Sequence, residues 1–171
     1  MHDFFSSPIW QFVGVVFALF AIVLSLIVFF KQRQRKRLDY DILSSTPLLS
    51  VREDIRGRVE ILFDKQPVEE VQLFIVKLTN TGNIPITKHD FEEPVTLTFG
   101  VDARLLTAEI IETSPKSLRT SIQGIDNRVI VQQGLLNAGD SITIKTLSTG
   151  GDNLSVDGRI QGVKGNSKLN G

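Results

Sequence analysis

The residue pair with the clearest chemical potential is His89-Asp90. A histidine that is oriented by a carboxylate can act as a general base toward a serine nucleophile. The chain has one other histidine, His2, and it has no G-x-S-x-G segment that would expose such a serine at a strand-to-helix turn. We therefore expect His89 to be an exposed loop residue. The sequence predicts no catalytic residue and no enzymatic activity.

Two short acidic segments, residues 90–94 and 152–158, have the composition of weak calcium sites. Carboxylates bind calcium and also act as general acids and bases. However, neighbouring side chains of an extended segment point in alternate directions, and neither segment has the spacing of an EF-hand loop. We expect solvated loop charge in the first segment and a turn leading into a strand in the second. No metal site and no cofactor are predicted.

Arg159 stands among the apolar strand positions of residues 154–160. The chain has neither a G-x-x-x-x-G-K-[ST] nor a G-x-G-x-x-G segment, so nothing in the sequence indicates a nucleotide site. We expect Arg159 to pair with a carboxylate inside the folded domain, and binding of an anionic ligand is the alternative.

The charge of the chain is divided unevenly along its length. Of 19 basic and 19 acidic residues, five basic and one acidic precede residue 38, which leaves 14 basic and 18 acidic after it. An acidic domain without a basic stripe argues against nucleic acid as a partner. Because the chain has no cysteine, it has no disulfide, no zinc-thiolate site and no cysteine nucleophile.

The most prominent structural feature of the sequence is the uncharged apolar run of residues 8–30. As a helix it would extend about 34 Å, enough to cross a hydrocarbon core of about 30 Å. A cleaved signal peptide is the alternative, but it requires a basic segment before a shorter apolar run. Residues 1–7 contain no Lys or Arg. We therefore predict a short N-terminal segment (1–7) and a single transmembrane helix (8–30), which is followed by the rest of the chain.

A basic cluster directly follows the apolar run, whereas no basic residue precedes it. Basic residues close to a span remain on the cytoplasmic side, which predicts an N-terminus outside the cell membrane and a cytoplasmic C-terminal domain. Membrane lipids are therefore predicted partners. We interpret the cluster as a topology signal, with recognition of anionic lipid head groups as the second possibility. The juxtamembrane segment 31–37 carries this cluster in Lys31, Arg33, Arg35, Lys36 and Arg37.

The small and polar residues of the apolar run recur at intervals of three and four. Such spacing places them on one stripe of a helix, and small residues let two helices approach closely. We predict a helix-packing face for a second copy of this chain, as a homo-oligomer, or for a partner transmembrane helix. Chance composition is the alternative. The stripe consists of Gln11, Gly14, Ala18, Ala21 and Ser25.

Residues 38–163 have the pattern of strands separated by turns. Apolar and polar residues alternate in 58–64, 95–99, 141–145 and 154–160, and the more continuously apolar segment 71–78 is predicted to be a central strand. Strands at intervals of about 10 to 15 residues, without a long helix, predict a β-sandwich of seven to nine strands. The polar residues 164–171 are predicted to form a flexible tail.

Two segments of this region carry a resemblance to a known family. Residues 76–86 (VKLTNTGNIPI) and 135–144 (LLNAGDSITI) resemble the turn-and-strand segments of bacterial immunoglobulin-like sandwiches, including CARDB-type domains, although Ala138 and Asp140 replace the usual proline and glutamate. The resemblance implies an immunoglobulin-like antiparallel β-sandwich, often an adhesive or packing module outside the cell. Its structural turns are Asn80, Gly82, Asn83, Gly139 and Asp140.

Together these patterns predict a non-enzymatic, single-pass membrane protein with an all-β domain. The expected role is interaction, scaffold or accessory. A sensing effector whose helix oligomerises to perturb the membrane, and an extracytoplasmic adhesion-type module, are the alternatives. The charge asymmetry favours the cytoplasmic placement over the extracytoplasmic one, because a fold does not determine its compartment.

Overall fold

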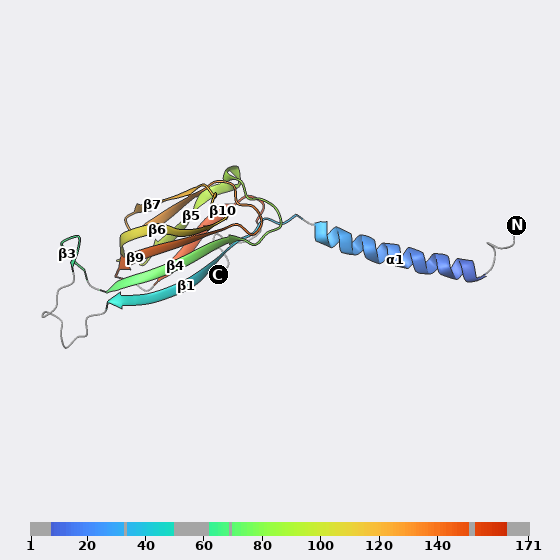
Figure 1. Ribbon diagram of the computed structural model, residues 1–171, viewed down its shortest axis with the longest axis horizontal. Helices are drawn as coiled ribbons and strands as arrows, with labels where there is room; N and C mark the ends of the chain where they lie inside the picture. The colour runs from blue at the N-terminus through green and yellow to red at the C-terminus, as the bar shows by residue number, and fades with distance from the viewer. Residues whose placement is uncertain (1–7, 33, 50–61, 69, 151–152, 164–171) are drawn as a thin grey trace. The chain divides into compact units, whose positions relative to one another are not determined.

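The computed structural model describes residues 8–32, 34–49, 62–68, 70–150 and 153–163 (Figure 1). The chain divides after Gln34 into a helical unit and a β unit. The predicted N-terminal segment 1–7, the tail 164–171 and most of the expected strand 58–64 lie outside the described residues. Of that strand, only the two residues of β2 (Leu62–Phe63) and Asp64 after them are described, and β2 pairs with β3 (Gln66–Pro67) in a short hairpin.

The helical unit contains α1 (Pro8–Gln32), which is 25 residues long. Its segment Phe12–Phe29 has a mean hydropathy of 3.1, and none of it is buried against the rest of the protein. The side chains of Phe12 and Phe17 are 70% and 69% exposed. A helix that is apolar on all sides is unfavourable in water. By length and composition α1 is sufficient to cross a membrane, a property that it shares with signal sequences near an N-terminus.

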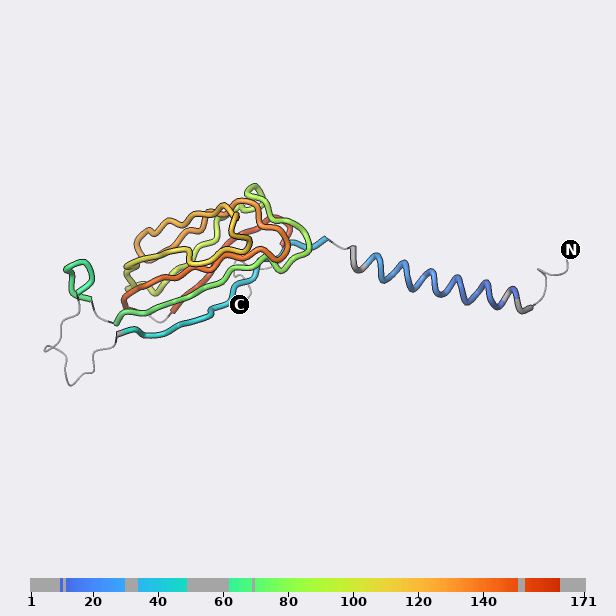
Figure 2. The backbone as a smooth tube through the Cα atoms, in the orientation of Figure 1, coloured from blue at the N-terminus to red at the C-terminus, as the bar shows by residue number. Residues whose placement is uncertain are grey.

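The β unit is a sandwich of two antiparallel four-stranded sheets (Figure 1). Sheet 1 has the order β1-β4-β9-β6, and sheet 2 has the order β10-β5-β8-β7. Figure 2 shows β1, in cyan, beside β4, in green, along their whole lengths. The strands are β1 (Leu38–Leu49), β4 (Val71–Asn80), β5 (Phe91–Phe99), β6 (Arg104–Ser114), β7 (Thr120–Ile125), β8 (Arg128–Gln133), β9 (Ser141–Thr149) and β10 (Leu154–Ile160).

The core lies between the two sheets and follows the alternation of the sequence. In β4, Phe74, Val76 and Leu78 are buried while the intervening residues are partly exposed. Val95 and Leu97 of β5 supply the facing layer and are fully buried. Burial of one such side chain contributes about 1.5–3 kcal/mol, so this continuous apolar layer is the main source of stability.

The predicted sandwich is confirmed, including the placement of β4 in the interior of its sheet between β1 and β9. The finer immunoglobulin-like assignment is not confirmed. In the immunoglobulin order the second strand of the sandwich pairs with its fifth. Here the second strand, β4, pairs instead with the seventh, β9, and the third strand, β5, lies between β8 and β10. Each sheet thus combines strands from both halves of the chain, in an order that differs from the immunoglobulin one.

Strand β1 is a feature that the sequence interpretation missed. Leu38, Tyr40 and Ile42 pair with inward-facing residues of β4, so the strand obeys the period of two. Shifts of register follow Ile42 and Pro47 and break the alternation. Bulges and a proline are common at edge strands, because they prevent another chain from adding to the sheet.

The antiparallel arrangement gives the sandwich two ends with different loops. At the first, which we call the linker end, the chain enters β1, the loops 81–90, 115–119 and 134–140 lie between strands, and residues 161–163 form the loop that follows β10. At the opposite, far end, the described loop residues are 64–65, 68, 70, 100–103, 126–127, 150 and 153. The residues with the most extensive polar contacts lie at the linker end.

Candidate functional site

The linker, residues Arg35–Arg37, lies along the turn that follows β4. The amide of Gly82 donates to the carbonyl oxygen of Arg37 at 3.2 Å, and the amide of Asn83 donates to that of Arg35 at 3.0 Å. The Asn83 side-chain oxygen accepts from the Arg35 amide at 2.6 Å. These bonds continue the contacts of the β1–β4 ladder beyond Leu38, the first residue of β1.

Gly82 is required where the linker crosses the turn. A Cβ atom placed on it would overlap the carbonyl oxygen of Arg35 and would lie 2.7 Å from the amide nitrogen of Arg37. Only a residue without a side chain therefore lets the two backbones approach this closely.

Asn80 organises the same turn from inside the sandwich. Its side chain is fully buried and donates to the carbonyl oxygens of Ile84 at 3.0 Å and Leu136 at 2.9 Å. Its own side-chain oxygen accepts from the amide of Gly82 at 3.0 Å. Since an unpaired buried amide is costly, the bonds with Ile84 and Gly82 stabilise the turn itself, and the bond to Leu136 holds the turn against the loop before β9.

The two segments that carried the family resemblance meet at this point. Gly139 donates its amide to the carbonyl oxygen of Asn80 at 2.8 Å and adopts a φ of +85°. The buried Asp140 accepts from the amide of Asn137 at 2.8 Å, and an isolated bridge joins Ile86 to Leu136. The five predicted structural turn residues thus form one connected network. We define the linker-docking site as these five residues, the linker Arg35–Arg37, and the neighbouring residues Asp39, Thr81, Thr87 and Asp90.

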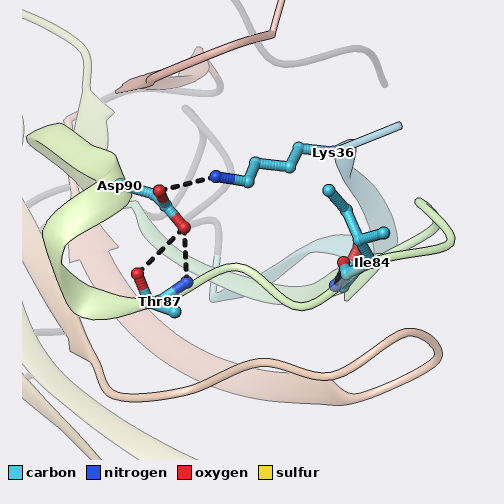
Figure 3. A network of polar contacts seen from close by, with 5 residues as sticks. Lys36, Ile84, Thr87 and Asp90 are labelled. Carbon is cyan, nitrogen blue, oxygen red and sulfur yellow. Dashed lines mark hydrogen bonds and ion pairs between the residues drawn. The ribbon is translucent and has the colours of Figure 1, made fainter. Parts of the chain in front are cut away.

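An ion pair joins the linker to the loop before β5 (Figure 3). The Lys36 ammonium lies 2.6 Å from one carboxylate oxygen of Asp90, and these side chains are only 24% and 13% exposed. The other oxygen accepts from the amide of Thr87 at 2.7 Å and from its hydroxyl at 3.0 Å. The bond from Lys36, followed by that from the Thr87 amide, lowers the pKa of Asp90 from 3.8 to about 2.

A second, more exposed pair holds the other side of the linker. The guanidinium of Arg37 lies 2.9 Å from the carboxylate of Asp39, and the hydroxyl of Thr81 donates to the same carboxylate at 2.7 Å. Two of the five predicted topology residues therefore have carboxylate partners within the sandwich, and Arg35 is held by its backbone. The side chains of Lys31 and Arg33 lie outside the described residues.

The expectations for the acidic segment and for Arg159 need correction. Asp90 is not a solvated loop charge, because it is buried and paired, and it ends a 3-10 helix, η2 (Lys88–Asp90). Glu92 and Glu93 belong to strand β5. Arg159 pairs with a carboxylate, that of Glu92 at 2.6 Å, but the pair lies on the surface and not inside the sandwich. The sequence T-x-x-D at 87–90 has the form of a capping box, a signal that could have placed Asp90 correctly.

The predicted packing face lies on α1. Gly14, Ala18, Ala21 and Ser25 are all exposed within this unit, and beyond the adjoining helix backbone no heavy atom lies within 4 Å of a Cβ built on Gly14. The Gln11 side chain lies outside the described residues. The stripe remains a prediction that the single chain does not test.

The hydrogen bonds and ion pairs of the linker-docking site hold separate segments of the chain together. Both carboxylate oxygens of Asp90 accept from Lys36 or Thr87, so this residue does not orient His89, which is exposed on η2. Across the described ranges, no group of three or more potential metal-ligating side chains is present. The site joins the incoming chain directly to the loop 81–90, and Asn80 joins that loop to the loop before β9.

No family model matches this sequence, and no curated protein matches it. The CARDB-type resemblance is therefore not confirmed. Among solved structures, the chain is similar to a biomass-sensing module from an Rsgi-like protein of Clostridium thermocellum, described as resembling a family 3 carbohydrate-binding module of the cellulosome. That match has a TM-score of 0.32 and 14% identity, and covers 80% of this chain and 86% of that one. A family IIIa CBD from Clostridium cellulolyticum matches with a TM-score of 0.31 and 12% identity, and covers 74% and 92%.

Proposed function

We propose that this protein is a non-enzymatic, membrane-anchored interaction or scaffold module. In this proposal α1 crosses the cell membrane once, the N-terminus lies outside, and the sandwich lies in the cytoplasm. The basic residues after α1 and their absence before it support this orientation.

The observation that carries the proposal is the short connection between an exposed apolar helix and a docked linker. α1 ends at Gln32, and the first residue held by the sandwich is Arg35. Three residues of chain extend at most about 11 Å. A flexible tether would let the domain move freely, whereas this connection restricts it to the membrane surface. Confinement of this kind raises the effective concentration of the domain for partners in the same membrane.

Membrane fractionation with alkaline carbonate extraction tests the anchoring. We expect the intact chain of 19.0 kDa, detected by a C-terminal tag, in the carbonate-resistant pellet. A shorter chain recovered from the soluble fraction would identify α1 as a cleaved signal sequence and would contradict the proposal.

We further propose that the stripe on α1 contacts another transmembrane helix, in a homo-oligomer or with a partner. Support comes from the three-and-four spacing of its small residues, which permits close helix packing. Replacement of Gly14 and Ala18 by leucine should abolish crosslinking of the chain within membranes. Replacement of Val15 and Val23 by leucine is the matched control and should retain it. Equal crosslinking in both variants would contradict the packing face.

A further inference from the structure

Exposed charges on the loops around the linker are all of one sign. Lys88 lies on η2, and Lys116 and Arg119 lie between β6 and β7, and all three are exposed. The acidic residues of the four linker-end loops, Asp90 and Asp140, are both buried. The structure describes every residue of these four ranges, so the exposed charge within them is entirely positive.

Contacts between the loops bring these cations to the same end of the sandwich. The amide of Gly134 donates to the carbonyl oxygen of Arg119 at 3.2 Å, and Leu136, in the same loop, pairs with Ile86. Asn83 in turn holds Arg35, whose side chain is also exposed. The segments that carry these cations are therefore joined to one another at the same end of the sandwich.

The far end has the opposite character. Its described loop residues expose four acidic side chains and one basic side chain. Among the described loop residues, exposed charge is therefore positive at the linker end and mostly negative at the far end, where strand residues add the exposed cations Arg104 and Arg128. The exposed far-end residues are Asp64, Glu70, Asp102, Asp126 and Lys65.

Some acidic residues of the strands close to the linker end lie beside cations, whereas Glu112 of β6 is exposed. Asp39 accepts from Arg37 and Thr81, as described above. Glu92 pairs with Arg159, and Glu93 is the neighbour of Arg159 in the register of β5 and β10. These carboxylates offset part of the positive charge of the loops.

Apolar residues are exposed among the cations. Leu135, in the loop before β9, is 51% exposed, and Pro85, in the loop before η2, is exposed as well. Cations with interspersed apolar side chains are suited to the head-group region of a bilayer, where both kinds of side chain find favourable surroundings. A soluble polyanion would use only the charges.

We propose that the linker end of the sandwich binds anionic lipid head groups of the membrane that holds α1. This inference rests on the proposed function, because the span brings the surface to the lipid. The contact uses Arg35, Lys88, Lys116 and Arg119, with Leu135 at the lipid boundary. It adds a lipid-binding surface on the folded domain to the basic segment that follows the span.

Site-specific quenching in reconstituted vesicles tests the inference, and the chain has no native cysteine to interfere. A fluorophore is attached to Ser117→Cys at the linker end, or to Val101→Cys, whose native side chain is 96% exposed at the far end. The vesicles contain phosphatidylcholine alone or with phosphatidylserine, plus a lipid that carries a quencher on its head group.

We expect quenching at position 117 to rise about twofold or more when phosphatidylserine is present and to fall again in high salt, as an electrostatic lipid contact requires. Quenching at position 101 should not change. The variant K88Q/K116Q/R119Q should lose the dependence on phosphatidylserine. The matched variant R104Q/R128Q, which neutralises two exposed cations near the far end, should keep it.

Two results would overturn the inference: quenching at position 117 that is the same with and without phosphatidylserine, or a dependence that survives in K88Q/K116Q/R119Q. Carbonate extraction of the same vesicles separates this failure from failure of the proposed function. If the chain remains in the membrane, only the head-group contact is wrong. If the chain is extracted, the anchoring itself is wrong.

Discussion

The two ends of the sandwich have similar turns, but these turns make different contacts. At each end an asparagine side chain donates to two carbonyl oxygens: Asn80 to Ile84 and Leu136, and Asn127 to Phe99 and Gly100. At the far end, Asn127 closes turns between neighbouring strands. At the linker end, Asn80 also supports the turn that binds the incoming chain. The difference indicates that the linker end is organised around the connection to α1.

The largest expected effect comes from removal of the buried asparagine. Asn80→Ala should lower the free energy of unfolding by about 2–4 kcal/mol, because three hydrogen bonds are lost in a fully buried position. Asn127→Ala at the far end should cost about 1 kcal/mol, since this residue is half-buried and more accessible to water. Urea unfolding of the full chain in detergent micelles, followed by circular dichroism, measures both. Equal losses of unfolding free energy in the two variants would contradict the difference between the two ends.

The next effect concerns the contact between the linker and its turn. Gly82→Ala should cost about 1–3 kcal/mol, because the new Cβ atom forces the backbone of Arg35 and Arg37 away. Hydrogen exchange should accelerate at the amides of Gly82 and Asn83, which donate to the linker. Gly162→Ala is the control, because its Cβ atom would meet no neighbour, the change strains only its own left-handed backbone, and Gly162 lies outside the linker-docking site. Unchanged exchange in Gly82→Ala would show that the linker is not docked.

The ion pair of Lys36 and Asp90 predicts a pH dependence. The pKa of Asp90 is lowered to about 2 in the folded state from 3.8, so the folded state binds the proton less readily than the unfolded state does. The resulting stabilisation is fully present above pH 4 and is lost as the pH falls from about 4 to about 2. Wild type should therefore exceed Asp90→Asn in stability at neutral pH and should converge with it near pH 2.

Lys36→Gln tests the assigned cause of that dependence. Because the lysine makes the largest contribution to the lowered pKa, this variant should show a weaker decline between pH 4 and 2 than wild type. Thermal unfolding across this range measures the difference. A decline as steep as that of wild type would assign the effect to the Thr87 amide instead.

The smallest effect is expected where charge at the linker end is exposed. Arg159→Ala breaks the pair with Glu92, whose side chain is 54% exposed, and should change stability by no more than about 0.5 kcal/mol. A loss of 2 kcal/mol or more would show that surface charge contributes to this end of the fold as strongly as its buried network.

Much of the sandwich could be predicted from the sequence, because its strands obey the period of two. The segment 71–78 and the alternating residues of β5, β9 and β10 were placed correctly, since an apolar face must be buried wherever the strand lies. Strand β1 was missed because Pro47 and two shifts of register interrupt its pattern. The strand order was not predictable, because alternation says which face is buried and not which strand is the neighbour.

The linker-docking site shows the same limit at the level of single residues. The turn residues Asn80, Gly82 and Asn83 were recognised by type, but their role in binding residues 35–37 depends on a contact about 45 positions away in the chain. The basic cluster was interpreted only as a topology signal. The partner of Lys36 was hidden within an acidic segment where burial, and not composition, distinguishes Asp90 from Glu92 and Glu93.

The central claim, a single span with the sandwich on the cytoplasmic side, is tested most directly by thiol accessibility in intact cells. Single cysteines at Ser6 and Val101 are treated with a membrane-impermeant reagent before and after permeabilisation, in a chain that has no native cysteine. We predict that Ser6→Cys reacts in intact cells and that Val101→Cys reacts only after permeabilisation. Reaction of Val101→Cys in intact cells would place the sandwich outside and would contradict the account.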